Sequence, residues 1–172
     1  MSDVHLHLLL NHVPILGTLF ALLLGAYGAV RRQPSVVRAA FLALVFCGAV
    51  ALAAKETGEG AEDAVEEIAG VSEQAIHDHE EAADKATIAS IALALLALGV
   101  LVWRRREDEL GTGPTVAVLV GAAVVFGLMA WTGNLGGQIR HTEIRGDADA
   151  SPAAVQSRTG ATREREGEVS DD

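Results

Sequence analysis

The sequence predicts an all-α integral membrane protein, a bundle of four transmembrane helices, and three observations support this fold class. Half of the 172 residues are hydrophobic although only 4% are aromatic, and the hydrophobic residues are concentrated in four blocks. Each block has about 18 to 23 residues, the length that an α-helix needs to cross the hydrocarbon core of a bilayer. Apart from Arg38 near the start of the second block, no block contains Lys, Arg, Asp or Glu, so none has the polar face that a helix of a soluble bundle requires.

The predicted spans cover about residues 8–30, 36–54, 86–103 and 114–131, and residues 1–145 are expected to form one four-helix domain. Ser72 suits a helix N-cap, so the third helix should begin there and run to about Arg106, with an extension beyond the bilayer. Residues 61–68 are expected to form a separate short helix, and the fourth helix to continue past Trp131 toward His141. Residues 146–172 are nearly free of large apolar side chains and predict a disordered acidic tail.

The distribution of charge predicts how the helices are oriented. Arginines are concentrated in the two short links between spans: Arg31, Arg32 and Arg38 in the first, and Arg104, Arg105 and Arg106 in the second. The link at residues 55–85 has eleven acidic and two basic residues instead. By the positive-inside rule the arginine links face the cytoplasm. Both termini and the acidic link are then expected on the outer face of a bacterial or archaeal plasma membrane.

Composition also excludes several classes of function. The formal net charge is −10 and no basic stripe is present, which argues against a nucleic-acid partner. Cys47 is the only cysteine and lies inside an apolar block, so there is no disulfide framework. No P-loop, dinucleotide-binding fingerprint or Ser/His/Asp constellation supports a conventional enzyme. A transporter is disfavoured because the spans have no charged or broken segment near the bilayer centre.

The six histidines provide the main functional indication. In the predicted topology all of them lie on the outer side, near the lipid boundary: His5, His7, His12, His77, His79 and His141. His77 is flanked one turn away on each side by glutamates, which is typical of a solvated face, whereas His79 lies over small residues. We therefore expect His12, His79 and His141 to converge, with His5 or His7 as a further member.

The segment around His12 is unusual for an apolar helix, because it also contains Asn11 and Pro14. Polar residues inside a span usually face the protein interior and mark a site. Since this segment is also the first turn and a half of the span, an interfacial position near the headgroups explains it as well. The sequence leaves both interpretations open.

Two kinds of cofactor suit such a histidine cluster. A b-type haem can be held between imidazoles on facing helices, which indicates an electron-transfer role. A Zn, Cu or Fe ion can be bound by imidazole and carboxylate, with Glu80 and Glu143 as candidate acidic ligands. A third interpretation has no cofactor at all: an accessory or structural subunit that associates with other membrane subunits or with copies of itself.

One segment resembles a known family. It reads His5-Leu-His-Leu-Leu-Leu-Asn-His-Val-Pro-Ile, and it precedes four spans and a histidine after the last span. This pattern is similar to that of a family of bacterial membrane proteins known as domain of unknown function 2231. The family usually has Phe where Val13 stands here. The resemblance implies four spans over about residues 5–145, and it implies no activity.

Overall fold

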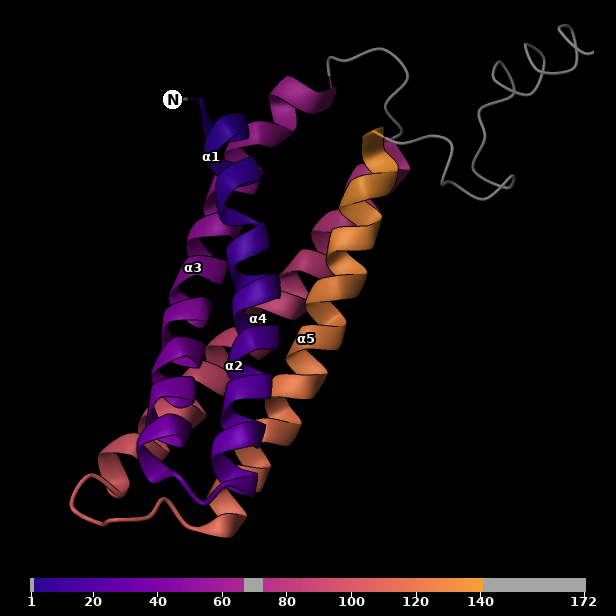
Figure 1. The fold of residues 1–172 in the computed structure, drawn as a ribbon. Coiled ribbons are helices and arrows are strands. Elements are labelled where there is room, and N and C mark those ends of the chain that lie inside the picture. Colours follow the sequence, from indigo (N-terminus) through magenta and orange to yellow (C-terminus); the bar gives the residue numbers. More distant parts are fainter. Residues whose placement is uncertain (1, 67–72, 141–172) are drawn as a thin grey trace, which may run out of the picture.

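A computed structural model describes residues 2–66 and 73–140, and this part of the chain is folded almost entirely into α-helices. The helices are α1 (Asp3–Leu10), α2 (His12–Val30), α3 (Pro34–Glu66), α4 (Glu73–Trp103) and α5 (Thr112–Arg140). No β-strand occurs within these residues. The predicted all-α fold class is confirmed (Figure 1).

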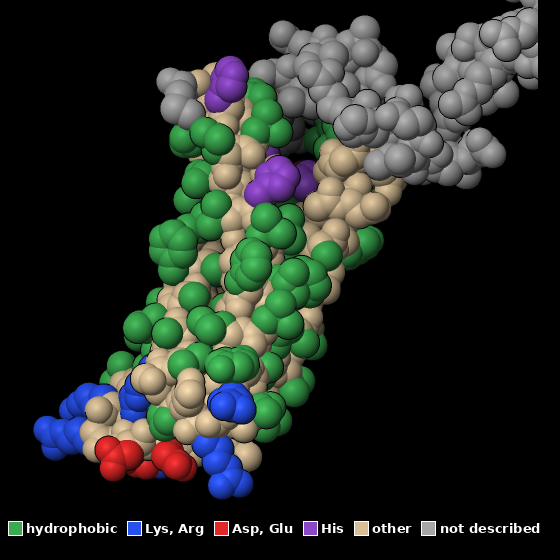
Figure 2. Space-filling view, viewed as in Figure 1, with side chains coloured by type: hydrophobic (Ala, Val, Ile, Leu, Met, Phe, Trp, Pro, Cys, Tyr) green, Lys and Arg blue, Asp and Glu red, His purple; other side chains and the backbone are tan. Residues whose placement is uncertain are grey.

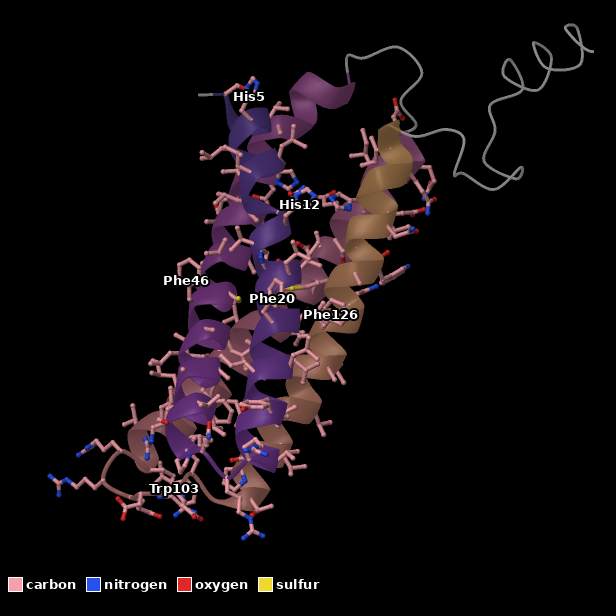
Figure 3. All side chains as sticks on the ribbon, viewed as in Figure 1. His5, His12, Phe20, Phe46, Trp103 and Phe126 are labelled. Carbon is pink, nitrogen blue, oxygen red and sulfur yellow. The ribbon has the colours of Figure 1, made fainter. Side chains whose placement is uncertain are left out.

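Within the described residues, four helical stretches are long and apolar enough to cross a membrane, and each contains one of the predicted spans. They are Val4–Val30, Pro34–Ala61, Glu73–Trp103 and Thr112–Ile139. Large hydrophobic side chains are exposed along them, among them Phe20, Phe46 and Trp103, each more than 60% exposed (Figure 3). Such exposure is unfavourable in water but natural in lipid, where the surrounding chains are equally apolar.

The long helices form a ring of neighbours. α2 packs against α3 and α5, α4 packs against the same two helices, and α1 lies mainly against α3. The bundle is therefore built from two helical hairpins, one made of α1, α2 and α3 and the other of α4 and α5 (Figure 1).

Small residues let the helices of different hairpins approach closely. A Cβ added at Gly48 on α3 would lie 2.6 Å from the Cβ of Ala94 and 3.2 Å from the backbone oxygen of Ser90, both on α4. In lipid, helices associate through close backbone packing of this kind, because burial of apolar surface provides little driving force. The glycine and alanine content noted in the sequence thus has a packing role at this contact.

The first span is interrupted near one end. α1 ends at Leu10, Asn11 adopts αR geometry in a turn, and α2 begins at His12. Pro14 explains the interruption, because its missing N–H cannot bond to the carbonyl of Leu10, four residues earlier. The break is mild, since the Asn11 N–H still donates to the His7 carbonyl at 2.9 Å.

Three helices extend beyond the apolar stretches on the same side of the bundle. The predicted extension before the third span is present in α4, and α5 continues past Trp131 to Arg140, as expected. The separate short helix predicted for residues 61–68 is wrong over its described part, because α3 is continuous to Glu66. An (i, i+4) ion pair between Lys55 and Glu59 and the bond from Thr57 to the Ala53 carbonyl support this continuation.

Arginine side chains organise the opposite end, which we call the arginine end (residues 31–38 and 104–106). Arg38 on α3 donates from Nη2 to the Arg104 carbonyl at 3.0 Å and to the Glu107 carbonyl at 2.6 Å. The Arg104 guanidinium lies 5.0 Å from the centre of the Trp103 ring and pairs with the Glu107 carboxylate. These contacts fix the link between α4 and α5 to the first hairpin.

The predicted acidic tail at residues 146–172 lies outside the described residues, as do His141 and Glu143. The domain boundary expected at residue 145 lies outside them as well.

Candidate functional site

All five described histidines lie at the end of the bundle opposite the arginine end, in the first turns of α1, α2 and α4. Figure 2 shows histidine side chains toward one end of the molecule and Lys and Arg side chains at the other, with an apolar surface between them. We call this end the histidine end (residues 2–12, 54–66, 73–85 and 132–140). The predicted placement of these five histidines on one side is thus reproduced by the fold.

His7 is turned from α1 toward α3. Its Nδ1 lies 2.8 Å from the carbonyl oxygen of Ala54, and its ring lies over Gly58. A Cβ added at Gly58 would come within 3.0 Å of His7 Cε1 and Nδ1. The absence of a side chain at Gly58 therefore gives the imidazole room to reach the backbone of α3.

His79 makes the same type of contact in the second hairpin. Its Nδ1 lies 3.0 Å from the carbonyl oxygen of Thr132 on α5. A Cβ added at Gly136 would lie 2.9 Å from His79 Cε1. In both hairpins the glycine follows the accepting carbonyl by four residues, one helical turn, so the two lie on the same helix face.

The carbonyl contacts indicate which ring nitrogen of each histidine carries a proton. A carbonyl oxygen can only accept a hydrogen bond, so Nδ1 of each histidine must carry the proton that it donates. In the neutral imidazole the other nitrogen, Nε2, then has a free lone pair. An Nδ1–H held by a backbone carbonyl is the arrangement that orients metal-ligating histidines.

The two rings lie at the same end of the bundle. His79 is half-buried. His7 is also partly buried. The histidine end therefore holds two imidazoles, one from each hairpin, that are fixed by the same backbone contact.

The other histidines have different surroundings. His5, His12 and His77 all have exposed side chains, and Ser2 Oγ bonds to His5 Nδ1 at 2.8 Å. Figure 3 shows His5 near the free end of α1 and His12 further along the first span, where α2 begins. His79 rather than His77 is turned to the bundle, as expected.

Of the expected trio His12, His79 and His141, the structure describes the first two and seats only His79 on a neighbouring helix. The helix faces explain why His7 takes the other inward position. His7, Asn11, Pro14 and Thr18 recur at helical spacing and are all at least partly buried. His5 and His12 share the neighbouring, exposed face.

Asn11 lies one turn below His7 on the buried face. Its Oδ1 is buried and has no hydrogen-bond partner within the described residues. A buried polar atom of this kind is costly unless something else satisfies it. The interior position of Asn11 favours the functional interpretation of this segment over the purely interfacial one.

The carboxylates do not complete a metal site in the described part of the chain. Glu80 is partly buried, but no group of three or more His, Cys, Asp or Glu side chains there is arranged to hold a metal ion. The acidic Asp84 instead pairs with Lys55 of α3, with 2.9 Å between Nζ and Oδ1. Gly58 and this ion pair could not be predicted from the sequence, because each depends on the register between helices.

The fold and the histidine end define the class: a four-span integral membrane protein with the described histidines at one end of the bundle. The chain belongs to the family described as predicted membrane protein (DUF2231), whose profile matches residues 4–143. The resemblance drawn from the first span is thereby confirmed. No curated protein and no solved structure matches the chain significantly.

Proposed function

We propose that the chain is a membrane-bound electron-transfer protein that holds a b-type haem between His7 and His79. The observation that carries the proposal is the matched pair of imidazoles, each with Nδ1 held by a backbone carbonyl and Nε2 left as a lone pair. A bis-imidazole haem needs two such nitrogens, one for each face of the macrocycle. A bound haem would supply one-electron chemistry at this end of the bundle.

Ligand number favours haem over a bare metal ion. Structural zinc sites take four protein ligands and catalytic ones take three, whereas the described residues contain no group of three. A Zn, Cu or Fe ion would therefore need a further ligand from outside the described part, such as His141 or Glu143. A haem requires only the two imidazoles already held in place.

The residues around the pair suit a flat group with polar and apolar parts. Gly58 and Gly136 make room for the two rings, and the buried Oδ1 of Asn11 offers an acceptor one turn deeper. The carbonyls of Ala54 and Thr132 would hold the proton of each imidazole on Nδ1, which leaves Nε2 as the nitrogen that can ligate iron.

We further propose that the histidine end faces the outside of a bacterial or archaeal plasma membrane. The arginine end carries Arg31, Arg32 and Arg38 together with the three arginines at 104–106, and basic links favour the cytoplasmic side. The redox partner would then approach from the outer surface. This partner would be another membrane subunit or a soluble electron carrier.

The same two histidine–carbonyl contacts also support a second function, that of a structural or accessory subunit. Each imidazole joins two helices by a hydrogen bond, His7 joining α1 to α3 and His79 joining α4 to α5. Bonds of this kind stabilise helix pairs in lipid without any cofactor. In that case the chain would be a structural or accessory subunit.

Optical spectroscopy separates these functions. The full-length protein is purified in mild detergent, titrated with haemin and reduced. The sharp visible band of bis-imidazole haem should appear in the wild type and be lost in His7→Ala and His79→Ala. His77→Ala is the matched control, because it removes an exposed histidine from the same helix and should leave the spectrum unchanged. A protein without haem but with stoichiometric metal by elemental analysis would favour the ion, and absence of both would favour the accessory subunit.

A further inference from the structure

The two hairpins share a pattern of histidines. Val4-His5-Leu6-His7 at the start of α1 and Ile76-His77-Asp78-His79 near the start of α4 both read apolar–His–X–His. The inner histidines His7 and His79 are 72 positions apart, as are the outer ones, His5 and His77. In both copies the outer histidine is exposed and the inner one bonds to the neighbouring helix.

The second helices of the hairpins correspond as well, with a shift of 78 positions. α3 begins at residue 34 and α5 at residue 112. The same shift carries Ala54 to Thr132 and Gly58 to Gly136, which are the carbonyl and the glycine that hold the two imidazoles.

The buried faces follow the same two shifts. In α2 and α4 the corresponding buried residues are Pro14, Thr18, Ala21, Gly25 and Gly28, and Ala86, Ser90, Leu93, Ala97 and Val100. In α3 and α5 they are Val37, Ala40, Leu44, Cys47 and Ala51, and Thr115, Val118, Ala122, Val125 and Met129. Helical periodicity alone would align buried stripes in each pair. It would not also align the His–X–His segments and the carbonyl–glycine pairs.

The packing of the ring agrees with this correspondence. Exchanging α2 with α4 and α3 with α5 turns the α3–α4 contact into the α5–α2 contact, and both contacts are present. This order of neighbours is the one that an approximate two-fold rotation about an axis along the bundle would produce, with His7 and His79 in equivalent positions.

We infer that the chain is a tandem duplication of one helical hairpin, and that Gly58 with the Ala54 carbonyl and Gly136 with the Thr132 carbonyl are equivalent positioning residues. Each pair holds an imidazole in the Nδ1–H form and presents its Nε2 to one shared ligand between the hairpins. The inference deepens the proposed function, because a planar metal macrocycle coordinated alike on both faces is the ligand that such a pair fits. It makes the two glycines as important as the histidines.

The tautomers can be measured without any ligand. Nitrogen-15 NMR of the histidine side chains in detergent distinguishes Nδ1–H from Nε2–H rings, and the signals of His7 and His79 are assigned by their loss in His7→Gln and His79→Gln. We expect both residues to be Nδ1–H in the wild type. Gly58→Ala should release only His7 from this form, and Gly136→Ala only His79, because each added Cβ would lie 2.9–3.0 Å from the ring.

Gly99→Ala is the matched control for both glycine variants. A Cβ added at Gly99 would have no atom of another helix within 4 Å. Both imidazole rings should therefore stay in the Nδ1–H form in this variant. The inference would be overturned if the wild-type rings were in the Nε2–H form. It would also be overturned if neither glycine substitution changed the tautomer of either ring. If a glycine variant does not fold, as judged by circular dichroism, the tautomers of His7 and His79 in the wild type still test the inference.

Haemin titration of the same proteins separates this inference from the proposed function. We expect each glycine variant to weaken haemin binding to a similar extent, about tenfold or more, as happens at metal sites when the groups that orient the ligands are lost. Wild-type rings in the Nδ1–H form without haemin binding would contradict the proposed haem and support the positioning role. Haemin binding that depends on only one glycine would overturn the equivalence of the two halves.

Discussion

The ammonium of Lys55 lies 2.9 Å from Oδ1 of Asp84, and this ion pair joins α3 to α4 at the histidine end. Lys55 is also paired with Glu59 on its own helix. Under the two shifts that relate the hairpins, Lys55 corresponds to Gly133 and Asp84 to His12. The contact between α2 and α5 therefore has a glycine and an imidazole where the contact between α3 and α4 has an ion pair, which is a clear departure from two-fold symmetry.

Asp84→Asn should lower the stability of the bundle. The change removes the charge that attracts Lys55 across two helices, and we expect a loss of about 1 kcal/mol, since both side chains are partly solvated. Thermal unfolding in detergent at low and high salt measures the effect, which should shrink as salt screens the pair. Glu81→Gln is the control, because the Glu81–Lys85 pair lies within α4 and is more exposed. Equal losses in the two variants would contradict a role in joining the helices.

Gly48→Ala should be more damaging than its small size suggests. The new Cβ would lie 2.6 Å from the Ala94 Cβ and 3.2 Å from the Ser90 oxygen, so α3 and α4 would have to move apart. Overpacking of this kind costs about 1–3 kcal/mol. The melting temperature in detergent should fall accordingly, whereas Gly99→Ala should leave it unchanged or raise it, since alanine favours a helix. A Gly48 variant as stable as the wild type would show that the helix contact is loose.

The spans could be predicted from the sequence because crossing a membrane is a local property. A block such as residues 86–103 has the required length and lacks charge, whatever its neighbours are. The continuation of α3 could not be predicted as easily. Gly58 and Gly60 resemble helix terminators in a sequence, and here Gly58 is helical and packed beneath His7.

The candidate site was predictable only in part. Its location at one end and the inward position of His79 follow from topology and from the small residues near it. The choice of His7 over His12 required the rotation of α1 and α2, which is fixed by the packing of Thr18 and Gly25 inside the bundle. The signal was nevertheless present, since the repeated His–X–His segments pair His7 with His79, whereas Asp84 and not a histidine corresponds to His12.

Arg38→Ala should loosen the arginine end without affecting the histidine end. Two charge-assisted bonds, to the Arg104 and Glu107 carbonyls, would be lost, at a cost of about 1–3 kcal/mol. The link at residues 104–111 should then be cleaved faster by trypsin. Arg31→Ala removes an exposed arginine from the other link at the same end, leaves the trypsin sites of the 104–111 link intact, and is the control for lost charge. An unchanged rate of cleavage in the Arg38 variant would show that the two Arg38 hydrogen bonds do not hold the link in place.

The orientation of the bundle can be tested in intact cells. Single cysteines are placed at His77 and at Asp108 in a Cys47→Ala background, and the cells are treated with a membrane-impermeant thiol reagent. Both positions are exposed but lie at opposite ends of the bundle. If basic links remain in the cytoplasm, the cysteine at 77 is labelled and the cysteine at 108 is labelled only after the cells are opened. The reverse pattern would place the histidine end inside, and a haem bound there would exchange electrons with cytoplasmic carriers instead of outer ones.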